Sequence, residues 1–359
     1  MLLLLLTLAS AQWSQLSPNG PPFLSGDPSA KVDSAALVPM WCVDSDVYLL
    51  TTHLWKFETR TMRWLWEPEV QIPLRTGAAH WTIRGTMYVY GGRNQSDMWS
   101  YNPRTRTATL IGSYAPTEGA AYWVHEQSNR LYIWGGLSDP SLLLRAFDVT
   151  TNVWHNVAYT GGGPDPTPYF GSATTNGVNT VYVYSNDRLW ALDLSTFVWT
   201  QSTVGITTPP GPSRVYQVMW ASKMLYGGSS GSKVYSDTWK YDSNQWTLLS
   251  NNVGPLPRQR FSTCTNVNGS LVLFGGDQNL NDLWVYGPVT ELTVFEKLEQ
   301  GLKSAVLWSF ASAVLSAFVL LCFTSIGVFA CVRRCKSRRG GGLSSSVKLA
   351  GNDNDFTQL

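Results

Sequence analysis

The stretch Leu271-Val272-Leu273-Phe274-Gly275-Gly276 is an unbroken hydrophobic run that ends in two glycines. Three other segments end in the same way: Tyr88-Val89-Tyr90-Gly91-Gly92, Tyr132-Ile133-Trp134-Gly135-Gly136 and Met224-Leu225-Tyr226-Gly227-Gly228. Two further runs lack the glycines and continue as Thr51-Thr52 and Ser185-Asn186. Short hydrophobic runs bounded by glycine predict buried β-strands that end in a sharp turn.

These six runs recur every 40 to 50 residues, and aromatic residues follow each of them. A period of this length with several strands in each unit is typical of a β-propeller. A single four-stranded sheet exposes two apolar faces, so such sheets stack around an axis and bury them. The sequence therefore predicts an all-β, six-bladed propeller over residues 12–288.

The repeat resembles the kelch repeat, as found in propellers of the galactose oxidase and attractin type. The resemblance implies four-stranded blades in which the glycine pair ends the second strand and the later aromatic residues lie on the third and fourth. Two positions depart from the pattern, because Ala108 replaces the second Trp of its unit and Arg145 replaces the first Trp of the next unit. The repeat-motif glycines are Gly91, Gly92, Gly135, Gly136, Gly227, Gly228, Gly275 and Gly276.

The sixth unit lacks a fourth strand, because Gly287-Pro288 follows its third one. At the other end of the chain, Gln12-Trp13-Ser14-Gln15-Leu16-Ser17 matches the closing strand Gln245-Trp246-Thr247-Leu248-Leu249-Ser250 of the fifth unit. We therefore expect the N-terminal strand, with Trp13, to complete the last blade and close the ring.

Two apolar segments predict how the propeller is displayed. Residues 1–11 combine a leucine run with Ala9-Ser10-Ala11 and indicate a secretory signal peptide; the competing interpretation is a buried N-terminal strand. No charge occurs in the 29 residues between Lys303 and Arg333, which predicts a transmembrane helix over 305–332 after a juxtamembrane stem over 289–304. The basic cluster that follows indicates a single-pass type I protein of the plasma membrane or of secretory-pathway membranes, rather than a core helix before a basic loop.

The predicted cytoplasmic tail, residues 333–359, is disordered and carries several partner motifs. Cys331 and Cys335 lie at the membrane boundary, a usual setting for palmitoylation, and the basic cluster attracts anionic lipids. Thr357 and Leu359 resemble the end of a ligand for PDZ-domain scaffolds. Small residues recur every fourth position along the apolar segment (Ala305, Ser309, Ala313, Ala317). This face would allow a homodimer through the transmembrane helix, although small residues are also common in membrane helices that do not dimerise.

Charge and cysteine usage narrow the function. Before Arg333 the chain has 20 basic and 22 acidic residues, a balance that disfavours nucleic acid as a partner. Cys42 and Cys264 lie in the first and last blades, so a disulfide across the seam and two unpaired thiols both remain open. Asn94 and Asn268 begin Asn-x-Ser motifs in predicted loops and are candidate glycosylation sites.

Catalytic motifs are not evident, and we expect no cofactor and no enzyme activity. The four histidines (His53, His80, His125, His155) lack metal-ligand spacing, so we interpret each as a structural residue. The expected function is binding of an extracellular or luminal protein or glycan. Its candidate binding face is formed by long loops at Leu137 to Leu144, Gly161 to Pro166 and Ser229 to Thr238, for which solvated tethers are the competing interpretation. The alternatives are a membrane-tethered enzyme acting on carbohydrate, for which bound copper would be the sign, and a sorting or structural role in the secretory pathway.

Overall fold

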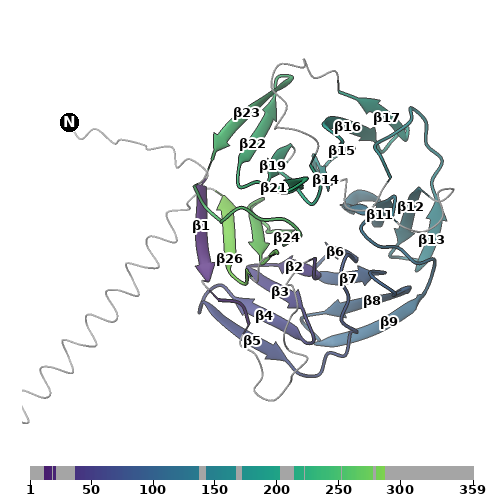
Figure 1. Cartoon of the computed structure of the whole chain (residues 1–359). Coiled ribbons are helices and arrows are strands. Elements are labelled where there is room, and N and C mark those ends of the chain that lie inside the picture. Colours follow the sequence, from purple (N-terminus) through teal and green to yellow (C-terminus); the bar gives the residue numbers. More distant parts are fainter. Residues whose placement is uncertain are drawn as a thin grey trace, which may run out of the picture. The chain divides into compact units, whose positions relative to one another are not determined.

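Six four-stranded antiparallel sheets surround one axis in the computed structural model (Figure 1). The structure describes residues 12–17, 19–21, 37–136, 143–166, 172–202, 214–221, 223–251, 253–277 and 280–287. Within these ranges the chain is all-β apart from a 3-10 turn, η2 (Glu126–Ser128). The six-bladed propeller expected from the repeat is therefore the observed fold.

Each blade runs from an inner strand beside the axis to an outer strand at the rim. Blade 1 contains β2 (Met40–Val43), β3 (Asp46–Leu50), β4 (Leu54–Glu58) and β5 (Arg63–Glu67). Blade 2 contains β6 (Ala79–Ile83), β7 (Thr86–Tyr90), β8 (Asp97–Asn102) and β9 (Thr107–Ser113). Blade 3 contains β10 (Ala121–His125), β11 (Arg130–Trp134), β12 (Leu144–Asp148) and β13 (Val153–Asn156).

The second half of the ring repeats this order with one insertion. Blade 4 contains β14 (Ser172–Thr175), β15 (Thr180–Ser185), β16 (Arg188–Asp193) and β17 (Val198–Gln201). Blade 5 contains β18 (Val218–Trp220), β19 (Met224–Tyr226), β22 (Thr238–Asp242) and β23 (Gln245–Ser250), with a small hairpin, β20 (Ser229–Ser230) and β21 (Lys233–Val234), inserted in it. Blade 6 contains β24 (Ser262–Thr265), β25 (Leu271–Phe274), β26 (Leu283–Gly287) and β1 (Gln12–Ser17).

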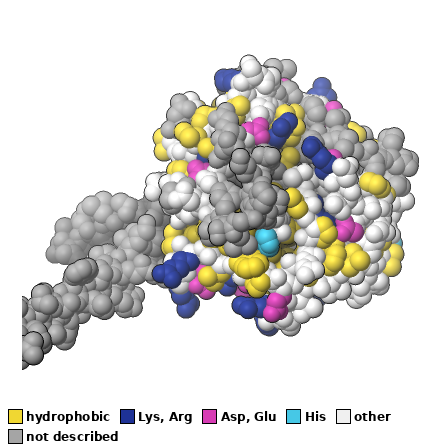
Figure 2. All heavy atoms as spheres, turned by 60° about the horizontal axis from the view of Figure 1, so that its bottom comes forward, with side chains coloured by type: hydrophobic (Ala, Val, Ile, Leu, Met, Phe, Trp, Pro, Cys, Tyr) yellow, Lys and Arg dark blue, Asp and Glu magenta, His cyan; other side chains and the backbone are white. Residues whose placement is uncertain are grey.

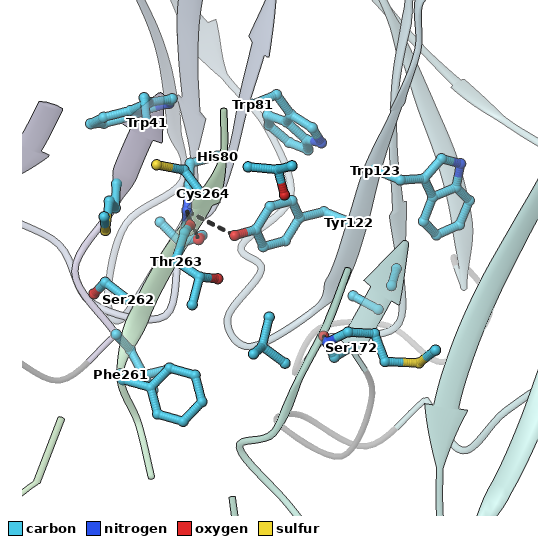
Figure 3. A pocket seen from close by; sticks show the side chains of 18 of the residues that line it. Trp41, His80, Trp81, Tyr122, Trp123, Ser172, Phe261, Ser262, Thr263 and Cys264 are labelled. Atoms are coloured by element: carbon cyan, nitrogen blue, oxygen red, sulfur yellow. Dashed lines mark hydrogen bonds between the residues drawn. The ribbon is translucent and has the colours of Figure 1, made fainter. Parts of the chain in front are cut away.

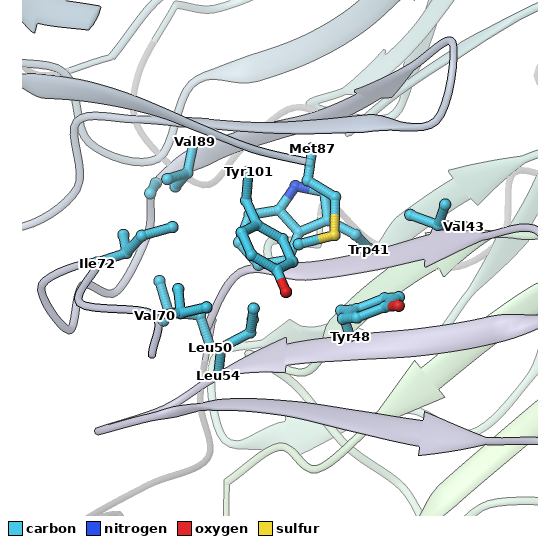
Figure 4. Packing of buried hydrophobic residues seen from close by; sticks show 11 residues of the cluster. Trp41, Val43, Tyr48, Leu50, Leu54, Val70, Ile72, Met87, Val89 and Tyr101 are labelled. Carbon is cyan, nitrogen blue, oxygen red and sulfur yellow. The ribbon is translucent and has the colours of Figure 1, made fainter. Parts of the chain in front are cut away.

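The hydrophobic core is divided among the seams between neighbouring blades. Figure 4 shows the seam between blades 1 and 2, where Trp41 and Tyr48 face Met87 and Tyr101. Alternate residues of each strand point to opposite faces of its sheet, so every blade contributes to two seams. A large aromatic side chain buried in a seam stabilises the fold by about 2 kcal/mol or more.

The ring is closed by the N-terminal strand, which is the outer strand of blade 6. β1 pairs antiparallel with β26, and Trp13 lies opposite Tyr286. The Trp13 indole is buried against Tyr226 of blade 5, with ring centroids 4.6 Å apart, and its Nε1 donates to Thr238 Oγ1 at 3.0 Å. The two ends of the propeller are thus held in one sheet.

The glycine pairs make the turn that leaves the second strand of four blades. All eight repeat-motif glycines have positive φ, a region that side chains disfavour. A Cβ atom on Gly92 would also lie 2.9 Å from the carbonyl oxygen of Thr76. In blade 1, Thr51 instead forms a tight turn in which its N–H donates to the carbonyl of His53.

The segments expected to govern membrane display lie outside the described residues. They are the signal peptide (1–11), the stem (289–304), the transmembrane helix (305–332) and the tail (333–359), with Cys331, Cys335, Thr357 and Leu359. The described part of the chain holds no helix with the length and hydrophobicity needed to cross a membrane.

Candidate functional site

The strongest candidate site is a cavity of about 330 Å³ on the propeller axis (Figure 3). Residues of the inner strands of all six blades line it. In the described sheets these strands pair only on their outer side, so their inner edges present backbone N–H and C=O groups toward the axis. A volume of this size lies in the range of small-ligand pockets.

The cavity lining is uncharged. It combines aromatic residues such as Tyr122, Tyr216 and Phe261 with small polar residues such as Ser262 and Thr263. No Asp, Glu, Lys or Arg occurs among the described residues that line it. Such a lining can bind a neutral group with both apolar and hydrogen-bonding surface, but it has no counter-charge for an ion.

Two inner-strand side chains meet inside the cavity. His80 of β6 and Tyr122 of β10 point toward one another in Figure 3, and the Tyr122 hydroxyl lies 2.8 Å from His80 Nε2. His80 Nδ1 lies 3.1 Å from the carbonyl oxygen of Ala78 and Nε2 lies 3.4 Å from the carbonyl oxygen of Thr263, so the tautomer decides which ring nitrogen donates. Burial lowers the pKa of His80 to about 4 and raises that of the Tyr122 hydroxyl above its ordinary value. Both groups are therefore neutral near pH 7.

The other three histidines lie away from this pair. His53 packs edge-on against Trp66, with ring centroids 5.3 Å apart; His125 bonds Ser128 at 2.7 Å; and His155 is exposed on β13. The described residues contain no group of three His, Cys, Asp or Glu side chains able to hold a metal ion. The interpretation of His80 as a purely structural residue is incomplete, because it faces the cavity.

Cys42 and Cys264 form a disulfide, with Cα atoms 5.5 Å apart. The bond joins β2 of blade 1 to β24 of blade 6, and both residues line the axial cavity.

Asn94 is exposed in the loop after β7, and Asn268 is exposed in the hairpin between β24 and β25. Both candidate glycosylation sites are therefore accessible and outside the cavity.

Two of the loops expected to form a binding face are anchored to the scaffold. Gly163 packs so closely on Trp134 that a Cβ atom would lie 2.8 Å from the indole. The β20–β21 insertion is held by Ser229, which bonds Gln259, and by Tyr235, over which the Arg214 guanidinium stacks at 4.0 Å. Residues 137–142 of the remaining loop lie outside the described part of the chain.

Buried arginines support the same end of three blades, a feature that the sequence analysis missed. Arg258 donates to both carboxylate oxygens of Asp282, at 2.8 and 3.1 Å, and to the carbonyl of Gly275 at 2.8 Å. Trp284 Nε1 donates to the same carboxylate at 2.6 Å. Burial alone would raise the pKa of Asp282. The hydrogen bonds from Arg258 and Trp284 and the arginine charge outweigh this effect and hold the pKa below its ordinary value. We call this arrangement the Arg–Asp–Trp cluster; the others are Arg75, Asp97 and Trp99, and Arg214, Asp237 and Trp239.

Comparison with known proteins supports the fold and leaves the family open. No protein-family model matches the chain, and no curated protein matches it. Among solved structures, the one described as "Structure of YjhT" matches with a TM-score of 0.56 and 14% sequence identity, over 76% of this chain and 95% of that one. At this identity the likeness shows the shared propeller fold alone.

Proposed function

We propose that this chain is a single-pass type I membrane protein whose kelch-type propeller binds an extracellular or luminal protein or glycan. The observation that carries the binding role is the uncharged axial cavity, which every blade helps to line. Ligand pockets in proteins are typically concave, largely preformed and mixed in polarity, as this cavity is. An uncharged part of the ligand would enter it and meet His80 and Tyr122.

The sequence supports the membrane part of the proposal. The long uncharged segment and the basic cluster after it favour a propeller outside the cytosol. A disulfide between Cys42 and Cys264 is compatible with an oxidising compartment. In that setting the exposed Asn94 and Asn268 would be glycosylated, and the tail would meet lipid headgroups and scaffold proteins.

Ligand binding is tested with the full chain displayed on cells, probed with arrays of secreted proteins and glycans. We expect a ligand whose affinity falls at least about ten-fold, or about 1.4 kcal/mol, when Tyr122→Phe removes the cavity hydroxyl. The matched control is His125→Gln, a change on the same strand outside the cavity lining. A ligand that binds both variants equally would show that the cavity is not the site.

Membrane display is tested by protease protection with a C-terminal tag. A propeller that is digested on intact cells, together with a protected tail fragment, is the expected result. A propeller that becomes accessible only after selective permeabilisation of the plasma membrane would place it in the cytosol and contradict the proposal.

A further inference from the structure

The outer strand of blade 1 differs from the outer strands of the other blades at one exposed position. Pairing between the third and fourth strands aligns the six outer strands, and Leu65, opposite Lys56, is 42% exposed. The equivalent residue is polar in every other blade: Thr109, His155, Thr200, Thr247 and Ser14. A leucine at this partly exposed position leaves apolar surface in contact with solvent.

The next residue strengthens the contrast. Trp66 is also 42% exposed, and blade 1 alone has an aromatic residue there; the others have Leu110, Asn156, Gln201, Leu248 and Gln15. The His53 ring packs edge-on against Trp66, which orients the indole. Figure 2, in which the bottom of Figure 1 comes forward, shows hydrophobic side chains among charged and polar ones on the face turned to the viewer.

The outer edge of this strand is unpaired within the described residues. β5 pairs with β4, and no strand in the described part of the chain pairs with its other side. Sheets usually protect such an edge with charged residues, because its backbone groups can pair with another chain. In β5 the charged residues are only at the two ends, Arg63 and Glu67, with Trp64-Leu65-Trp66 between them.

We propose that β5 is a homodimer interface, in which it pairs antiparallel with β5 of a second copy around a two-fold axis at Leu65. The strand is self-complementary in this register. Arg63 of each copy lies opposite Glu67 of the other, Trp64 lies opposite Trp66, and Leu65 lies opposite itself. An isologous contact of this kind closes after two copies. The proposal is independent of the ligand and of the transmembrane helix.

The charges at the ends of the strand fit this register. Glu67 is mostly buried and lies 3.6 Å from Arg106 Nε, so Arg63 of the second copy would approach the rim of an existing ion pair. Any other register would place a charged residue opposite a tryptophan or separate the Leu65 residues of the two copies. The alignment at Leu65 therefore brings the two leucines together on one face of the joined sheet and sets each Trp66 beside Trp64 of the other copy on the opposite face.

Cysteine cross-linking tests the axis directly. Directly opposed residues of an antiparallel pair have Cβ atoms about 4.5–5.5 Å apart, within reach of a disulfide after small adjustment. We expect Leu65→Cys in the full chain to form a covalent dimer on mild oxidation, seen on a non-reducing gel. Thr109→Cys, at the same position of blade 2, should stay monomeric, and the parent chain controls for its native cysteines. Absence of the Leu65→Cys dimer, or equal cross-linking of both variants, would overturn the proposal.

A second measurement follows the association itself. In detergent, the concentration dependence of the mass of the full chain should show a dimer, and Leu65→Lys should weaken it at least about ten-fold by placing like charges on the axis. Thr109→Lys adds the same charge to blade 2 and should leave the dimer unchanged. A chain that stays monomeric at every concentration would refute the homodimer. The same holds if the monomeric chain uses β5 to bind a different protein.

Discussion

Removing the disulfide between Cys42 and Cys264 should destabilise the propeller strongly, because the bond joins residues far apart in the sequence. The separation is 222 residues. In the chain-entropy description, a loop of this length removes about 18 cal/mol/K from the unfolded chain, or about 5 kcal/mol at 25 °C. Residual structure in the unfolded state reduces such values, so we expect the double variant Cys42→Ala, Cys264→Ala to lose about 3–5 kcal/mol of unfolding free energy.

The assay is urea unfolding of the full chain in detergent, followed by tryptophan fluorescence. The parent chain treated with a dithiol reductant should shift to the midpoint of the double variant, which separates loss of the bond from loss of side-chain packing. β1 still pairs with β26 in both forms, so the fold should persist at low urea. A loss below about 1 kcal/mol would refute the reasoning, since it would mean that the unfolded chain is already constrained without the bond.

Three further changes test the scaffold and the cavity. Asp282→Asn leaves the buried Arg258 charge unpaired and should cost about 3–5 kcal/mol in urea unfolding, whereas Asp242→Asn, at the exposed pair with Lys240, should cost under about 1 kcal/mol. The unfolded chain protonates His80 near pH 6.5 and the folded chain only near pH 4, so its contribution to stability falls as the pH drops through this window. Urea midpoints at pH 7 and 4.5 should therefore differ less in His80→Gln than in the parent; an equal difference would contradict the buried neutral histidine. Trp13→Ala should cost about 3–5 kcal/mol by emptying the closing seam, and a cost near zero would mean that β1 is dispensable.

The sequence predicted the ring because its period and its glycine pairs are local signals. The matching Gln-Trp starts of residues 12–17 and 245–250 also placed the closing strand, which pairs with β26 in the structure. The pair of His80 and Tyr122 was missed, although both follow an alanine and precede a tryptophan at the same position of successive repeats. Equivalent positions on neighbouring inner strands meet at the axis of a propeller. The contact between His80 and Tyr122 could therefore have been predicted from the aligned repeats, given a ring of blades.

The arginine clusters show why other contacts could not be predicted from spacing alone. Asp97, Asp237 and Asp282 each stand two residues before a tryptophan, a repeated pattern visible in the sequence. Their arginine partners lie 22 to 24 residues earlier, on the loop that enters the same blade. Loop lengths between repeats vary, so only the fold shows that a guanidinium reaches the carboxylate. The exposed β5 edge is likewise visible only after the outer strands are aligned by their pairing.

Blade 3 also holds a buried guanidinium at this end, but there the arginine comes from a different part of the blade's sequence. Thr117 stands two residues before Gly119, as Arg75 stands two residues before Gly77. Arg145, at the position of the blade's first tryptophan, donates back to the Thr117 hydroxyl and lies 3.5 Å from the Tyr90 hydroxyl. A guanidinium therefore fills the space between the same two segments, although it comes from the third strand instead of the entering loop. The departure at Arg145 is thus a rearranged support of the blade, and substituting tryptophan there alone would leave Thr117 without its donor.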